Sequence, residues 1–103
     1  MQQQPTDPVK VFVSKYLSKG PEQFYNSIIY HSLSGLSEDN KEYNPAIELL
    51  DYYEVFLKLY RREGNQVNLD LSILFRKASH KVYRVLLKKK LIETNLRFLN
   101  VVA

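Results

Sequence analysis

Residues 44–65 read NPAIELLDYYEVFLKLYRREGN, and this stretch determines the expected fold more than any other. Asn44 followed by Pro45 is typical of a helix N-terminus, because the asparagine side chain caps the first turn and proline fits its first position. Gly64 ends the pattern after two arginines that suit a helix C-terminus. The stretch therefore predicts a helix over about 45–62. Its core face has helical spacing and comprises Ala46, Leu49, Leu50, Tyr53, Phe56, Leu57 and Tyr60.

Two shorter helices are expected before this one. Asp7-Pro8 repeats the cap-plus-proline signal, and Gly20-Pro21 stops the pattern, so the first helix should cover about residues 8–19. Its apolar face comprises Val9, Phe12, Val13, Tyr16 and Leu17. A second helix should follow over 21–34, with Phe24 and His31 on the flank of its buried stripe. That stripe comprises Tyr25, Ile28, Ile29 and Leu33.

A long helix is expected in the C-terminal third. Asn68 or Asp70 can cap its start, and it should continue to about Lys90. Its apolar residues are spaced alternately by four and by three positions, which is a heptad seam of about four repeats. A lysine occupies one position of the seam. The seam comprises Leu71, Phe75, Ala78, Val82, Val85, Lys89, Ile92, Leu96 and Leu99. Residues 96–102 are rich in β-formers and predict, as an alternative to helix, a short extended tail.

These elements predict an all-α fold, a small four-helix bundle with a long C-terminal helix, in a single domain over residues 1–103. Residues 1–6 predict a disordered arm, and the polar residues 35–44 predict a loop. Apolar residues make up 45% of the chain, which is ordinary for a globular domain. The chain has no cysteine, no apolar run of the ~18 residues that span a bilayer, and no targeting signal at its start. We therefore expect an intracellular protein, cytoplasmic or nuclear, that does not bind a membrane.

Charge divides the chain unevenly. Residues 1–70 carry seven Lys and Arg against ten Asp and Glu, whereas residues 71–103 carry eight against one. Such a split within one domain suggests that one face meets something acidic. Four of the cations recur at i, i+4, i+7 and i+11, namely Lys77, Lys81, Arg84 and Lys88. This stripe predicts contact with an acidic partner or with phosphates, although a solvated helix face is the commoner reason for a charge run.

Two of the expected helices carry more apolar surface than one core needs. The extra residues, together with the tyrosines that fall off the main stripes, predict a docking surface for a protein partner or a second copy. That apolar surface comprises Tyr52, Val55, Leu59, Ile73, Tyr83, Leu87 and Leu91. Tyr30 is a further interface candidate because it also lies off the main stripes. The alternative is that these helices are central in the bundle and buried on both sides.

Signals for catalysis are weak. His31 and His80 are the only histidines, and neither has a second ligand or carboxylate at useful spacing on its own helix. The acidic residues of 38–42 lack the spacing of a calcium loop, and no glycine belongs to a phosphate-binding loop. We therefore expect no catalytic residues, no cofactor, no metal and no small-molecule substrate.

Two short motifs resemble those of known families. Leu57-Lys-Leu59-Tyr60-Arg61 is similar to the leucine-tyrosine-arginine motif of small mitochondrial assembly factors, which are basic helical bundles. Tyr16-Leu17, followed by Asn44-Pro45 and residues 49–53, is similar to the two-helix dimerisation and docking module of kinase regulatory subunits and chromatin-complex subunits. Each resemblance covers less than half of the chain and implies a helical interaction module.

The sequence thus predicts a non-catalytic interaction or scaffold subunit of a larger assembly or a homo-oligomer. The second hypothesis is a nucleic-acid-binding domain that uses the basic helix. A third, narrower one takes residues 86–93 as the end of a recognition helix and residues 96–102 as a β-wing, which requires extended backbone over 96–102.

Overall fold

The computed structural model describes residues 7–34 and 44–101, with side chains up to Phe98. The arm expected over 1–6 and all of the loop expected over 35–44 except Asn44 lie outside these residues. The described residues form five helices and no strand: α1 (Pro8–Lys19), α2 (Pro21–Ser34), α3 (Pro45–Glu63), α4 (Gln66–Lys88) and α5 (Leu96–Val101). The prediction of an all-α fold with four main helices is confirmed.

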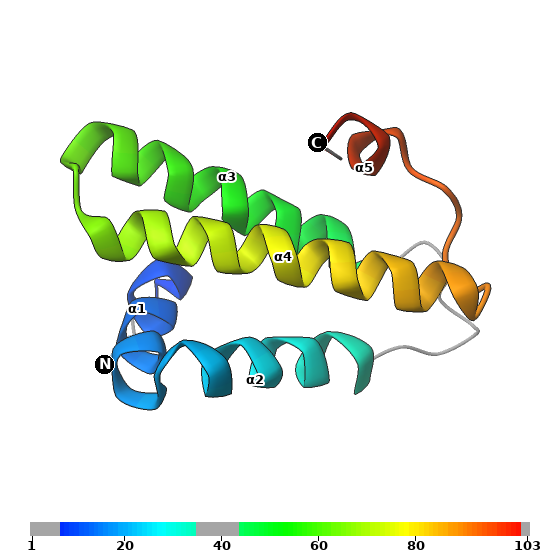
Figure 1. Cartoon of the computed structure of the whole chain (residues 1–103), viewed down its shortest axis with the longest axis horizontal. Helices are drawn as coiled ribbons and strands as arrows, with labels where there is room; N and C mark the ends of the chain where they lie inside the picture. Colours follow the sequence, from blue (N-terminus) through cyan, green and yellow to red (C-terminus); the bar gives the residue numbers. More distant parts are fainter. Residues whose placement is uncertain (1–6, 35–43, 102–103) are drawn as a thin grey trace, which may run out of the picture.

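Helices α3 and α4 form an antiparallel hairpin, and α4 lies at the centre of the molecule (Figure 1). Helix α2 packs along the other side of α4, while α1 crosses the bundle at the end nearest the α3–α4 turn. Only Gly64 and Asn65 join the two long helices. Gly64 adopts φ +72° and caps α3, and the Asn65 side chain accepts a hydrogen bond from the Val67 N–H at 3.0 Å. One two-residue turn therefore supplies both caps.

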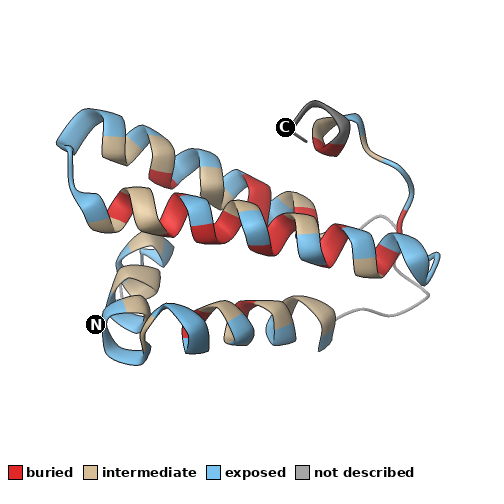
Figure 2. Ribbon diagram, viewed as in Figure 1, coloured by how far each residue is buried: buried red, intermediate tan, exposed pale blue. Residues whose placement is uncertain are grey.

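The core is an aromatic cluster centred on Phe75 of α4. Its ring lies between those of Phe12, Phe24, Tyr52 and Phe56, with centroid separations of 5.1–6.0 Å. Phe75 and Phe56 are both fully buried. Figure 2 shows the buried residues concentrated where α3 and α4 face each other. The rings of α1 and α2 reach this same cluster, so one core unites four helices.

Several details of the predicted stripes are wrong. Phe24, expected on the flank of α2, is buried in the core, whereas Leu17 of α1 is 64% exposed. Asn65 caps α4 in place of Asn68 or Asp70, and Asn68 is buried. The buried stripe of α4 follows the period of a straight helix, so Val85 is partly exposed and Leu86 is buried.

The C-terminal segment differs most from expectation. Helix α4 ends at Lys88, so the heptad seam does not continue as one helix through Lys89 and Ile92. The N–H of Lys90 donates to the Leu87 carbonyl and that of Leu91 to the Leu86 carbonyl, both at 3.0 Å, as in a Schellman motif. The chain then turns back, and α5 occupies 96–101. Helical backbone there contradicts both the extended tail and the β-wing.

Lys90 stands in this motif where glycine is usual, at φ +61°. A side chain in the left-handed region is strained, because Cβ approaches the backbone carbonyl. We expect Lys90→Gly to raise the free energy of unfolding by about 0.5 kcal/mol, since relief of this strain exceeds the added entropy of the unfolded chain. Urea denaturation measures the change. Gly64→Ala, at φ +72°, should lower stability by about 1 kcal/mol for the converse reason. A destabilising Lys90→Gly would contradict the assigned turn.

Candidate partner-binding site

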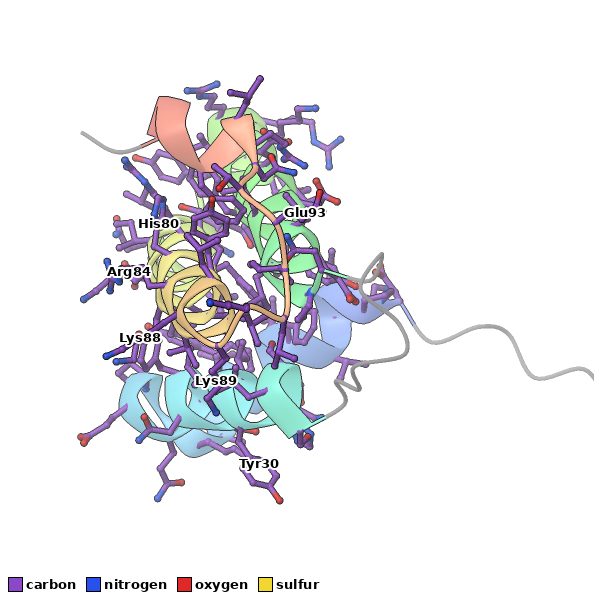
Figure 3. The ribbon with its side chains drawn as sticks, turned by 90° about the vertical axis from the view of Figure 1, so that its right-hand side faces the viewer. Tyr30, His80, Arg84, Lys88, Lys89 and Glu93 are labelled. Carbon is purple, nitrogen blue, oxygen red and sulfur yellow. The ribbon has the colours of Figure 1, made fainter. Side chains whose placement is uncertain are left out.

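The cationic stripe (Lys77, Lys81, Arg84 and Lys88) lies on the outer side of α4. All four side chains are exposed, and at 100° per residue they fall within about 60° of one another. Figure 3 shows Arg84 and Lys88 on the outer side of α4, next to His80, whereas Lys89 and Glu93 point elsewhere. None of the four makes an ion pair with any residue that the structure describes. The stripe is therefore a coherent positive surface with no ion-pair partner among the described residues.

The seven residues of the predicted apolar surface do not come together. Only Ile73, Val55 and Leu87 are exposed, at 50%, 38% and 37%. Val55 belongs to α3, while Ile73 and Leu87 lie on α4 near the two ends of the cationic stripe. Of the other four, Tyr52, Leu59 and Leu91 are half-buried against the core, and Tyr83 is buried. The α4 residues thus add apolar area to a basic face and do not form a separate one.

Tyr83, which was expected on the apolar docking surface, is not exposed. It is buried, its ring stacks on Phe98 of α5 at a centroid distance of 4.1 Å, and its hydroxyl accepts a hydrogen bond from the Asn95 N–H at 3.0 Å. Tyr83 is therefore covered by α5 of the same chain and is not available to a partner. Tyr30, by contrast, is 69% exposed on α2 (Figure 3).

A shallow groove of about 610 Å³ runs beside the cationic stripe. Its walls are Tyr25 of α2 on one side and Tyr53 and Leu57 of α3 on the other. The α4 residues that line it are Leu69, Ser72, Ile73, Arg76, Lys77, His80 and Arg84. The groove thus combines tyrosyl and aliphatic walls with four basic or imidazole side chains, and it shares Lys77 and Arg84 with the stripe. We call this feature the α4 groove.

One cation–π contact lies within the α4 groove, and two ion pairs join α5 to α3 outside it. The Arg76 guanidinium lies 5.9 Å from the centroid of the Tyr53 ring, within cation–π range. Arg97 of α5 pairs with Asp51 at 2.9 Å and with Glu54 at 3.4 Å, both on α3. These carboxylates are exposed, so the pairs orient α5 more than they stabilise it. Asp51 and Glu54 of α3 therefore face Arg97 of α5.

His80 lines the α4 groove at the point where α5 packs against α4. Its ring packs edge-on against Phe98 at 5.5 Å, and its Nε2 atom is buried without a hydrogen-bond partner among the described residues. Burial lowers the pKa of the His80 imidazole, and the positive charges of Arg76 and Arg84 lower it further. The neutral ring is therefore the form that suits the folded state.

This environment predicts a pH dependence of stability. Because the folded-state pKa of His80 lies below the ordinary value of 6.5, the unfolded chain takes up the proton first as pH falls. We expect the free energy of unfolding to decrease from about pH 7 towards pH 5, with part of the decrease absent in His80→Gln. Urea denaturation of both proteins across this range is the measurement. Parallel pH profiles for wild type and His80→Gln would contradict the assignment.

Some site residues were missed by sequence reasoning. Tyr53 and Leu57 were assigned to the core stripe of α3 and Tyr25 to that of α2, yet all three are half-buried and line the groove. Helix α5 had a detectable signal: the Asn95 side chain accepts a hydrogen bond from the Arg97 N–H at 2.9 Å, as a capping asparagine does.

Across 7–34 and 44–101, no three His, Asp or Glu side chains gather as metal ligands would. None of the described helices is both long and apolar enough to cross a bilayer. Comparisons with protein-family models, with curated proteins and with solved structures find no match to this chain.

Proposed function

We propose that this chain is a non-catalytic interaction subunit, and that it binds an acidic partner protein through the outer face of α4. One observation carries the proposal: four exposed cations share one face of the central helix and make no ion pair with a described residue. Like charges held this close repel one another, so a partner that neutralises them gains free energy.

The apolar residues on this face support a protein partner. Ile73 and Leu87 are exposed beside the cations, and protein interfaces combine an apolar centre with a charged rim that selects and orients the partner. Self-association through this face alone is disfavoured, because a symmetric pair would place two positive stripes against each other.

Reversing the stripe should abolish partner binding. We expect Lys77→Glu, Lys81→Glu, Arg84→Glu and Lys88→Glu together to reduce partner recovery from a nuclease-treated extract to background, because attraction becomes repulsion. The matched control reverses four exposed cations elsewhere, namely Lys10, Lys15, Lys19 and Lys58. It undergoes the same change in net charge and should recover the partner as wild type does. Equal recovery by both variants would contradict the proposal.

Nucleic-acid binding is the second candidate function, favoured by the regular spacing of the same four cations along α4. If each contacts one phosphate of duplex DNA, affinity should fall roughly 100-fold between about 50 and 200 mM salt. Fluorescence anisotropy with a labelled duplex and a labelled single strand tests this. Such a salt dependence, lost in the reversed variant, would favour nucleic acid over protein.

A further inference from the structure

A helix of the same chain, α5, packs beside the α4 groove. Helix α5 is seated across α3 and α4, with Phe98 against Tyr83 and His80 and with Arg97 on the carboxylates of Asp51 and Glu54. His80 also lines the open groove, so the seat of α5 and the open groove adjoin. Figure 1 shows α5 over the part of the hairpin away from the α3–α4 turn. An aromatic residue and a charge complementary to the wall hold this helix in place.

The open part of the groove has the opposite charge. Where α5 meets carboxylates of α3, the open groove presents Arg76, Lys77 and Arg84 of α4. Its apolar components are Tyr53 and Leu57 on the α3 wall and Ile73, which is half-exposed. A segment that binds here must therefore supply carboxylates on one side and apolar side chains beside them.

The shape of this site favours a helix. The α4 residues that line the groove extend from Leu69 to Arg84, which is about 22 Å at 1.5 Å per residue and matches a helix of roughly 15 residues. The described part of the chain has no strand, and therefore offers no sheet edge on which an extended peptide could be added. A groove of this length along a helix suits the binding of an amphipathic helix.

We propose that the open α4 groove binds an acidic amphipathic helix of a partner protein. This inference rests on the proposed function and specifies the part of the partner that is recognised. Carboxylates at i and i+7 of the bound helix face Lys77 and Arg84, and its apolar stripe covers Ile73 and Leu57. Nucleic acid fits the site less well, because Ile73 and Leu57 cannot pair with phosphates and Arg76 already covers Tyr53, a candidate for base stacking.

The test is selection from a displayed library of 18-residue helical peptides on the full-length chain. The enriched peptides should carry Asp or Glu at i and i+7 beside a stripe of Leu, Ile or Phe. Lys77→Glu with Ile73→Ala should weaken the best peptide at least about tenfold in fluorescence anisotropy. The matched control, Lys15→Glu with Leu17→Ala on α1, should leave its affinity unchanged. Both changed pairs are exposed, so both variants should fold.

Three results would overturn the inference. The first is enrichment of peptides without acidic residues. The second is peptide binding with the same affinity to the wild type and to the groove variant. The third is an 18-nucleotide single strand that binds more tightly than every peptide and displaces the best peptide. Partner recovery that depends on the cationic stripe, together with failure to enrich acidic helices, would retain the proposed function and reject only the helical ligand. If partner recovery does not depend on the cationic stripe and acidic helices are not enriched, the proposed function and the helical ligand are both rejected.

Discussion

Phe75→Ala should remove a large part of the stability of the fold. Phe75 is fully buried and its ring contacts Phe12, Phe24, Tyr52 and Phe56, so truncation removes a contact from α1, α2 and α3 at once. Truncation of a buried phenylalanine costs about 3–5 kcal/mol, against about 5–15 kcal/mol for the whole stability of a domain. Urea denaturation followed by circular dichroism measures the loss.

Phe75→Leu is the matched control for this prediction. It keeps most of the buried volume and should cost less than Phe75→Ala, because the remaining cavity is smaller. A loss of less than about 1 kcal/mol for Phe75→Ala would contradict the central place of this ring in the core.

Phe98→Ala should release α5 while leaving the four main helices folded. Phe98 is 1% exposed, stacks on Tyr83 and packs against His80. The ion pairs of Arg97 are exposed and cannot hold six residues of helix by themselves. The cost to global stability should therefore be limited to the free energy of docking α5, even though Phe→Ala nominally costs about 3–5 kcal/mol.

Hydrogen exchange measures this local release. The Asn95 N–H, which donates to the Tyr83 hydroxyl, should lose its protection and exchange as in an unfolded chain. Amides of α3 and the first turns of α4 should keep theirs. Arg97→Ala is the comparison variant and should leave most of the protection at Asn95. Cooperative loss of protection in all helices of Phe98→Ala would contradict the docking of α5 as a separable unit.

Local signals predicted the helix ends where they act alone. Asn44-Pro45 and Gly64 placed α3 to within one residue, and Asp7-Pro8 with Gly20 did the same for α1. The start of α4 was misjudged because Asn65 caps it immediately after Gly64, leaving a turn shorter than expected. Capping chemistry is local, and so it can be predicted from neighbouring residues.

The end of α4 depends on contacts that are distant in sequence. Lys88-Lys89-Lys90 contains no helix breaker. Lys90 adopts a left-handed backbone conformation, and glycine is the usual residue at such a position and would have predicted the helix end. The chain turns back there so that Phe98 reaches Tyr83, fifteen residues earlier in the sequence. Intrinsic helix propensity favoured continuation, and tertiary packing overrode it.

The candidate site also has one part that local sequence predicts and one part that depends on tertiary packing. The cationic stripe follows from spacing alone, because helical geometry fixes which side chains share a face. The walls of the α4 groove come from Tyr25 and from Tyr53 and Leu57 on two other helices, and their approach to α4 depends on packing. The burial of Tyr83 likewise required the position of α5.

Lysine reactivity in native extract tests the central claim most directly, because it requires no knowledge of the partner. Acetylation of the intact chain, read by mass spectrometry, compares Lys77, Lys81 and Lys88 of α4 with the exposed lysines Lys10, Lys15 and Lys19 of α1. We expect the α4 lysines to react about fivefold less in extract than in the purified chain, since a partner buries them, and the α1 lysines to be unchanged. Equal reactivity of the α4 lysines in extract and in isolation would contradict the assignment of this face as the partner-binding surface.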